Sequence, residues 1–507
     1  MKKHFAVLLC TIMLFTAVVG CSNNNAGGNV SQKDSVVVYV SDIFSMLNPF
    51  ATTANSDQYI FNQVYETLAV VDDNGKVNPC LAESWEISED ALTYTFHLVE
   101  GAKFHNDEEL KASDVVFTFN MAKKYPGKKN FIDMVESVEA LDEYTVCIKL
   151  NKPTPLFLVY LHEVPIMNEK FVTEAGEAIN ETACGTGPYK LVEIDFATAA
   201  KLTRFDDYRL EPAAIKDVEL RYISDASSAV IALEAGEVHF MDVVPSMVGT
   251  LLENPNFNHD LRQPLNTSVI SVNTTVPPLD NKLVRQALTY ACDKQSMIDI
   301  AYEGYAVPAR LQANTNCFGV DFSDATDFSY NPEKAKELLA EAGYPNGFDF
   351  ADFGITMDVL GGSFHEKIAQ VFQQNLADIG VKLELRNTAT PDEDAQSGNF
   401  ALMNQGLSYR ADFSYNVCHY GTVGLGGNNF SQMSDPWVDE MFKKGELETD
   451  PEKRKAIYKE LIEYLVDYCP SIPIFHRQMI YVWAKDLNAV AHDSTVHPYY
   501  IYEWSWN

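Results

Sequence analysis

The chain has 507 residues, of which 71 are acidic and 38 basic, for a formal net charge of −33. So acidic a chain lacks the basic face that binding to nucleic acid or to anionic lipid needs, which excludes nucleic acid as an expected partner. With 46% hydrophobic residues it is not a disordered acidic tail, and its length predicts two or three lobes with large cores.

The N-terminus resembles a bacterial lipoprotein signal. Lys2 and Lys3 precede an apolar run, residues 5–19, which is shorter than the roughly 20 apolar residues that span a bilayer and fits an export signal. Small residues then lead to Cys21 and a polar tether that extends to residue 35. The resemblance implies cleavage before Cys21 and lipid on that cysteine. The alternative is a plain secretory signal with an incidental cysteine. Either signal predicts an extracytoplasmic protein, and the lipid would hold it on the outer face of the cell membrane, facing the periplasm in a Gram-negative cell.

The remaining cysteines are seven in number once Cys10 leaves with the signal and Cys21 takes lipid. They are widely scattered and form no CxxC pair, so they predict buried apolar side chains rather than a disulfide framework. These seven are Cys80, Cys147, Cys184, Cys292, Cys317, Cys418 and Cys469.

The first half of the mature chain is rich in strand patterns. Residues 36–40 (VVVYV) form a continuous apolar run typical of a buried strand. Residues 92–98 and 144–150 alternate apolar and polar side chains, which predicts a mostly antiparallel sheet with one covered face. Residues 226–236 then read as a helix that ends at glycine, followed by a strand over residues 237–244.

The second half predicts alternating helices and strands. Apolar residues recur at helical spacing within residues 281–302. Residues 331–343 predict a helix with an Asn-Pro N-cap that ends at Gly343. Residues 450–468 predict another helix, which starts with an Asp-Pro N-cap. Strands are expected at 348–358, 381–387 and 481–485. The second half is therefore α/β.

Motifs of catalysis and metal binding were not found. There is no GxSxG, HExxH, P-loop or paired-cysteine zinc spacing. Cys418 and His419 are adjacent and lack an evident third ligand, so a structural or cleft-lining role is favoured over a metal site. The sequence thus predicts no catalytic residue, no cofactor and no metal, and a protein that is not an enzyme.

Seven stretches together resemble one family. In order, they are residues 81–98 (LAESWEISEDALTYTFHL), 101–105 (GAKFH), 111–119 (KASDVVFTF), 185–191 (GTGPYKL), 235–238 (AGEV), 284–288 (VRQAL) and 335–343 (AKELLAEAG). Their order and spacing resemble the oligopeptide, dipeptide and nickel-type substrate-binding proteins of ABC importers, and the resemblance covers almost the whole mature chain.

The resemblance implies an α/β, two-lobed periplasmic-binding-protein-like (type II) fold with an extra inserted lobe. We expect the first lobe at 36–66, 183–275 and 485–507, the inserted lobe at 67–182 and the second lobe at 276–484. The chain would cross between lobes near residues 275 and 485. Gly185 and Gly187 suit a tight turn where the chain passes between lobes. A monomer that delivers its solute to the transmembrane subunits of an ABC permease is expected.

The resemblance also carries over a ligand residue. Peptide-binding members have an aromatic-x-Ala-Asp-aromatic stretch whose Asp pairs with the α-ammonium of the peptide, and residues 409–413 (YRADF) match it. Asp412 is therefore the expected amine anchor, with an Asx-turn as the structural alternative. The other expected ligand-binding residues are Tyr409, Arg410, Phe413, Tyr415 and His419. Arg410 is the nearby candidate for the carboxylate of a peptide.

Capture of a short peptide is thus the leading functional hypothesis. Alternatives in the same transport role are a nickel chelate, glutathione or an oligosaccharide, and a sensory or adhesive lipoprotein is an alternative outside transport. An extracytoplasmic hydrolase is disfavoured by the missing motifs. Substituting Asp412 with alanine is expected to weaken peptide binding more than about tenfold with little loss of stability.

Overall fold

The computed structural model describes residues 34–507, apart from several short gaps. The gaps are residues 53, 73–75, 126–128, 155, 250, 264–265, 361–362, 389–397, 399, 409–411 and 493–498. The predicted export signal, the lipidation residue Cys21 and most of the tether lie outside the described residues, as do Tyr409 and Arg410.

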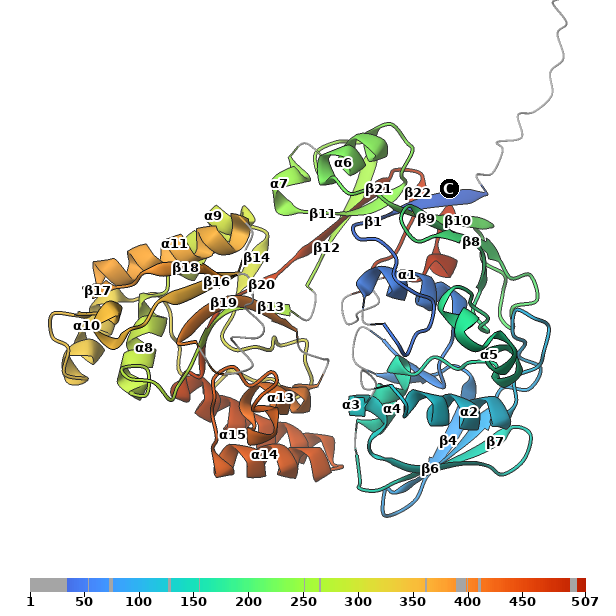
Figure 1. Ribbon diagram of the computed structural model, residues 1–507, viewed down its shortest axis with the longest axis horizontal. Helices are drawn as coiled ribbons and strands as arrows, with labels where there is room; N and C mark the ends of the chain where they lie inside the picture. The colour runs from blue at the N-terminus through green and yellow to red at the C-terminus, as the bar shows by residue number, and fades with distance from the viewer. Residues whose placement is uncertain are drawn as a thin grey trace, which may run out of the picture. The chain divides into compact units, whose positions relative to one another are not determined.

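A seven-stranded sheet has β1 near its centre, with β10 and β11 parallel to it on either side (Figure 1). Val36, Val38 and Val40 of β1 are buried, which confirms the predicted buried strand. In spatial order the strands are β12 (Phe257–Arg262), β21 (Met479–Ala484), β11 (Phe240–Val243), β1 (Ser35–Val40), β10 (Asp217–Tyr222), β9 (Ala199–Arg204) and β8 (Tyr189–Asp195). The helices that accompany them are α1 (Asn55–Val64), α6 (Ala226–Glu234) and α7 (Pro245–Val248).

A separate four-stranded antiparallel sheet confirms the alternating pattern. In β5, Tyr94, Phe96 and Leu98 are buried and their neighbours are partly exposed, and helix α2 contacts strands β6 and β7. The strands are β4 (Ala82–Ile87), β5 (Thr93–Leu98), β7 (Thr145–Leu150) and β6 (Val135–Ala140). Nearby elements are β2 (Ala69–Val71), β3 (Val77–Pro79), α2 (Ala112–Ala122), α3 (Lys129–Ile132), α4 (Phe157–Tyr160), η2 (Leu161–Glu163), α5 (Glu169–Ala175) and η3 (Gly176–Asn180).

The second half of the chain builds a six-stranded mixed sheet, with α9 and α11 along one side of the strands and α8 and α10 along the other (Figure 1). The predicted α/β character is confirmed. The strands, in spatial order, are β14 (Ala306–Pro308), β20 (Ser471–Arg477), β13 (Asn266–Val272), β19 (Leu402–Ser408), β16 (Met357–Leu360) and β18 (Leu385–Thr388). The helices are α8 (Lys282–Ala291), α9 (Lys294–Tyr302), α10 (Pro332–Glu341) and α11 (Ser363–Asp378).

Two expected strands of this region are broken: residues 381–387, which are divided between two different sheets, and residues 348–358. β15 (Phe348–Asp349) pairs with β17 (Val381–Lys382), and η4 (Phe350–Phe353) separates it from β16. The break at residues 348–358 has a local cause, because the Asp349 side chain accepts a hydrogen bond from the Ala351 amide and Gly354 adopts a left-handed backbone with φ of +69°. Asp349 and Gly354 therefore form a turn that interrupts the expected strand.

Two helices, α14 (Pro436–Leu447) and α15 (Pro451–Tyr468), enclose a further apolar core with η5 (Phe413–Asn416) and α13 (Val417–Tyr420). Asp450 caps α15 as predicted, since its Oδ1 accepts hydrogen bonds from the amides of Glu452 and Lys453. Short elements complete the chain: η6 (Thr422–Gly424), β22 (Leu487–Asn488), η7 (Ile501–Glu503) and β23 (Ser505–Trp506). Among the helices the structure describes, none is both long and apolar enough to cross a membrane.

The chain changes from one large sheet to the other earlier than expected. β12 ends at Arg262 in the seven-stranded sheet and β13 begins at Asn266 in the six-stranded sheet. On the return, β20 and β21 are separated by Gln478 alone. The lobe crossings predicted near residues 275 and 485 lie later in the chain than these two changes of sheet, and the lobe limits stay a prediction.

Gly185 and Gly187 serve a close approach of two backbones. A Cβ on Gly185 would lie 2.0 Å from the Val64 carbonyl oxygen, and one on Gly187 would lie 2.6 Å from that of Gln63. The Gly187 amide donates to the Val64 carbonyl at 2.9 Å. The two glycines therefore let residues 185–187 pack directly on the end of α1.

Candidate ligand-binding site

Asp412 stands at the start of the 3-10 helix η5 and caps it. Its Oδ1 accepts a hydrogen bond from the Ser414 amide at 2.9 Å, the geometry of an Asx-turn. The next residue, Phe413, donates its amide to the Phe318 carbonyl at 3.0 Å. The structural role weighed as an alternative for Asp412 is therefore present.

Asp412 also forms a buried ion pair that the sequence analysis did not anticipate. Arg454 donates from one terminal nitrogen to Oδ2 at 2.7 Å and from the other to Oδ1 at 2.8 Å. The side chains are only 8% (Arg454) and 7% (Asp412) exposed. Because both oxygens accept from one planar guanidinium, this is a bidentate pair, the strongest geometry for these groups.

Arg454 makes two further hydrogen bonds. Its Nε donates to the Gly445 carbonyl at 2.9 Å, and a terminal nitrogen lies 3.2 Å from the Tyr458 hydroxyl. A sequence signal for this role existed: Arg454, Tyr458 and Leu461 recur at helical spacing on the buried face of α15. A charged residue on an apolar helix face predicts a buried partner.

A cavity of about 610 Å³ lies beside this pair. Its walls come from two distant parts of the chain: Leu156 and Val159 at α4, and a second group formed by residues 315–321, Asp412 and the first half of α15. Both signs of charge line it, with Lys455 and Lys459 near Glu452 and the Asp412–Arg454 pair. Such a cavity matches a solute that itself carries both charges.

The electrostatics link α4 to Asp412. Burial raises the pKa of the Asp412 carboxyl from its ordinary value, and the charge of Arg454 acts in the opposite direction. Burial also raises the pKa of the Tyr160 hydroxyl, with the Asp412 carboxylate as the next cause. Tyr160, which the sequence analysis did not select, is therefore close enough to respond to charge at Asp412.

The other predicted residues that the structure describes, Phe413, Tyr415 and His419, are not among the lining of this cavity. Phe413 is fully buried, its ring centre 5.9 Å from that of Phe442, and it offers no surface to a solute in this conformation. His419 is 4% exposed, with Nδ1 3.3 Å from the Asn428 carbonyl oxygen, and Tyr415 is partly exposed beside it. The cause is η5, whose tight turn directs Phe413 into the core while Asp412 faces the cavity.

The arrangement has no evident metal chemistry in the part of the chain that is described, where no group of three His, Cys, Asp or Glu side chains is placed to hold an ion. Cys418 is partly exposed next to the buried His419. What the site can offer a ligand is therefore charge, hydrogen bonding and an enclosed surface.

Comparison with known proteins identifies the family of the chain. The family model for bacterial extracellular solute-binding proteins, family 5 (middle), matches residues 76–429. The chain is 30% identical to heme-binding protein A of Haemophilus influenzae, over 83% of this chain and 82% of the relative. It is 32% identical to the glutathione-binding protein GsiB of Pectobacterium atrosepticum, over 90% and 91%. It is 30% identical to di/tripeptide-binding protein 1 of Pseudomonas aeruginosa, over 84% of each chain.

Solved structures show the same fold. HbpA2 of Haemophilus parasuis matches with a TM-score of 0.84 at 28% identity, over 93% of this chain and all of that one. The ABC transporter substrate-binding protein CtaP of Listeria monocytogenes matches with a TM-score of 0.85 at 25% identity, over 94% and 100%. The expected two-lobed type II fold is confirmed. The chain belongs to family 5 of the bacterial extracellular solute-binding proteins and is an extracytoplasmic substrate-binding protein of an ABC importer for peptides or related cargo.

Proposed function

We propose that this protein is a lipid-anchored receptor that captures short peptides at the Asp412 cavity and delivers them to an ABC permease. The observation that carries the proposal is the cavity of about 610 Å³ whose lining brings a buried carboxylate, a guanidinium and two lysines together. A peptide with free ends carries an ammonium and a carboxylate, which such a lining complements. Relatives that bind di/tripeptides and glutathione support this class of cargo.

Asp412 can bind the ammonium of a peptide only while it also remains paired with Arg454. Its Oδ1 already accepts from Ser414 and Arg454, whereas Oδ2 accepts from Arg454 alone. Since a carboxylate oxygen has two lone pairs, Oδ2 retains one direction for a further donor. Arg454 would then fix the orientation of the carboxylate, and an ammonium in the cavity would complete a three-membered charge arrangement.

Lys455 is the candidate for the opposite end of the peptide. Its side chain is half exposed and its partner Glu452 is 81% exposed, so their ion pair at 2.9 Å is readily exchanged. Lys459 is less available, since it pairs with Asp324 at 2.6 Å and lies 3.4 Å from Asp321. Arg410, the residue expected from the sequence, lies outside the described residues and keeps its place as a candidate.

Native mass spectrometry of residues 22–507, purified from rich medium without refolding, tests the cargo. A spread of adducts at the masses of short peptides supports the proposal. One discrete adduct that carries a metal or a sugar would keep the transport role and overturn the peptide cargo.

Calorimetric titration then tests the amine anchor. A tripeptide with a free amine should bind Asp412→Asn more weakly than wild type, and its N-acetylated form should bind both proteins equally weakly. Asp358→Asn is the matched control, because Asp358 is 1% exposed, accepts two hydrogen bonds from Nε and one terminal nitrogen of Arg386, and does not line the cavity. Equal affinity for both peptides in wild type would remove Asp412 from the proposed role.

The proposed lipid anchor at Cys21 has a separate test. In cells, Cys21→Ala should abolish incorporation of labelled fatty acid. Retention of label in that variant would overturn lipidation at Cys21.

A further inference from the structure

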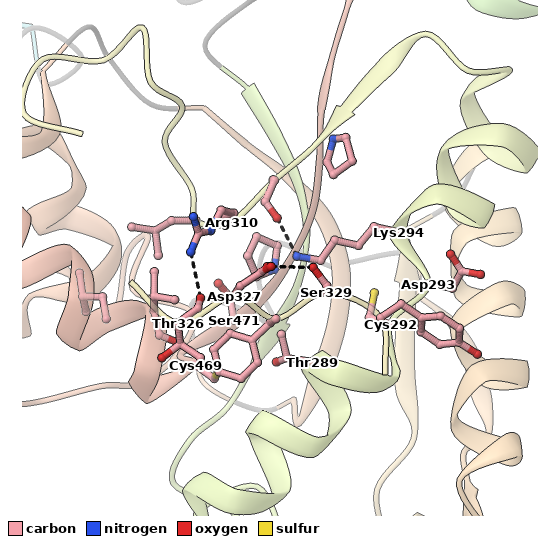
Figure 2. A pocket seen from close by; sticks show the side chains of 18 of the residues that line it. Thr289, Cys292, Asp293, Lys294, Arg310, Thr326, Asp327, Ser329, Cys469 and Ser471 are labelled. Atoms are coloured by element: carbon pink, nitrogen blue, oxygen red, sulfur yellow. Dashed lines mark hydrogen bonds between the residues drawn. The ribbon is translucent and has the colours of Figure 1, made fainter. Parts of the chain in front are cut away.

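A second cavity, of about 350 Å³, lies in the part of the chain that holds the six-stranded sheet. It is formed where α8 gives way to α9, where α15 ends and where residues 308–311 and 326–330 pass between them (Figure 2). Hydroxyl groups of Thr289, Ser329 and Ser471 are among its lining. Among the described residues it shares no lining side chain with the Asp412 cavity.

Lys294 supplies an incompletely satisfied cation to this cavity. Its Nζ donates to the Ala309 carbonyl at 2.7 Å, and among the described residues no carboxylate lies within ion-pairing distance of it. Burial lowers the pKa of the Lys294 ammonium. An ammonium has three protons to donate, so two remain for a ligand or for water.

Arg310 supplies a second cation. Its terminal nitrogens donate to the carbonyls of Phe322 at 3.1 Å, Ala325 at 2.7 Å and Thr326 at 3.1 Å, while its Nε is buried without a hydrogen-bond partner. In the described part of the chain it too has no carboxylate at ion-pairing distance. Figure 2 shows Arg310 and Lys294 approaching the cavity from opposite sides.

Two aspartates line the cavity beside Lys294 and Arg310, and only one of them lies near both cations. Asp293 caps α9 by accepting from the amide and hydroxyl of Ser296, and its carboxylate is directed away from Lys294 in Figure 2. Asp327 lies among the lining residues near both cations; it is exposed and accepts a hydrogen bond from Ser329 at 2.9 Å. One carboxylate therefore faces the cavity together with two cations.

We propose that this cavity is a second solute site, which binds a small molecule through an oxyanion group held between Lys294 and Arg310. A cation that is taken partly out of water without a partner charge is unfavourable, and a carboxylate or phosphate would provide the missing partner. The volume limits the ligand to a small one, and Asp327 favours a ligand that also carries an ammonium, such as a free amino acid. The site is independent of the peptide proposed for the Asp412 cavity.

Calorimetric titration of dialysed protein, residues 22–507, tests the site with acetate, inorganic phosphate and glycine as probes. We expect one equivalent of at least one probe to bind with a Kd of about 1 mM or tighter. Lys294→Gln and Arg310→Gln should each weaken binding at least about tenfold, or about 1.4 kcal/mol. Lys282→Gln is the matched control, since Lys282 also opens a helix but is paired with Asp467 outside the cavity.

The variant Asp327→Asn distinguishes the ligand classes. It should tighten acetate and phosphate binding by removing a like charge, and weaken glycine binding by removing the partner of its ammonium. Thermal unfolding of each variant establishes that it is folded before titration. The proposal is overturned if no probe binds the wild type, or if Lys294→Gln and Arg310→Gln bind as well as Lys282→Gln.

Discussion

Arg454 and Lys294 are cations of the second half of the chain that line two different cavities, and they differ in what surrounds them. Arg454 donates four hydrogen bonds, two to a carboxylate, one to a carbonyl and one to a hydroxyl. Lys294 meets one carbonyl. A cation that the chain itself satisfies holds the structure together, whereas one that the chain leaves unsatisfied is available to a ligand.

The largest expected effect comes from breaking the satisfied pair. Asp412→Ala leaves Arg454 buried without its counter-ion, so the free energy of unfolding should fall by about 3–5 kcal/mol. This differs from the expectation of little loss of stability, which rested on the sequence before Arg454 was known to be the partner. Urea unfolding followed by circular dichroism gives the value.

Two controls sharpen that measurement. Asp358→Ala should cost less, because its partner Arg386 is 55% exposed and can be solvated when the carboxylate is lost. The double variant Asp412→Leu with Arg454→Met should recover most of the lost stability, since it removes both charges together. A double variant as unstable as Asp412→Ala would mean that packing rather than charge dominates there.

His476 adds to this comparison a buried side chain whose neutral form is favoured in the folded protein. Burial lowers the pKa of this histidine to about 4, and the charge on Lys294 acts in the same direction. Its neutral form is the folded form, so its contribution to stability is complete above the ordinary pKa of about 6.5 and is lost as the pH falls toward 4. The loss should reach about 3 kcal/mol at pH 4.

The measurement is urea unfolding of wild type and His476→Gln at pH 7.5 and at pH 4.5. Other groups also titrate in this range, so the informative quantity is the difference between the two proteins. Wild type should lose more stability than His476→Gln on acidification. Equal losses would show that His476 is protonated in the folded protein.

Lys294→Met should have a small effect on the free energy of unfolding, opposite in sign to the effect of Asp412→Ala. Removing a cation that lacks a partner charge should leave the free energy of unfolding unchanged or raise it by up to about 1 kcal/mol in buffer without an oxyanion. Differential scanning calorimetry in a cationic, chloride-based buffer measures this. A marked loss of stability would mean that its bond to Ala309 is a structural requirement.

The elements of both halves could be predicted where local rules decide them. The alternation in residues 92–98 became β5, and the caps at Asn331 and Asp450 opened α10 and α15 as expected. These features depend on neighbours within a few residues, which is what periodicity and capping describe.

The site was harder to predict because its geometry depends on distant segments. Asp412 and Arg454 are separated by 42 positions along the chain, and no local pattern joins them. The burial of the Phe413 side chain depends on η5. Which described groups surround Lys294 depends on the path of residues 308–311. The family motif could identify Asp412 as a residue of interest, but only tertiary packing shows what else it binds.

The smallest expected effect concerns an ion pair between segments that lie next in sequence to those lining the Asp412 cavity. Lys152, just before α4, lies 2.7 Å from Glu446 of α14, with side chains 52% and 38% exposed. Exposed pairs are worth about 0–1 kcal/mol and are screened by salt, so Lys152→Ala should barely change stability. Its effect on peptide affinity is the informative one: if the pair helps hold the two walls of the cavity together, affinity should fall two- to threefold at low salt and the difference should disappear in about 1 M salt. A loss of affinity independent of salt would contradict an electrostatic role and would assign the effect to packing of the lysine stem.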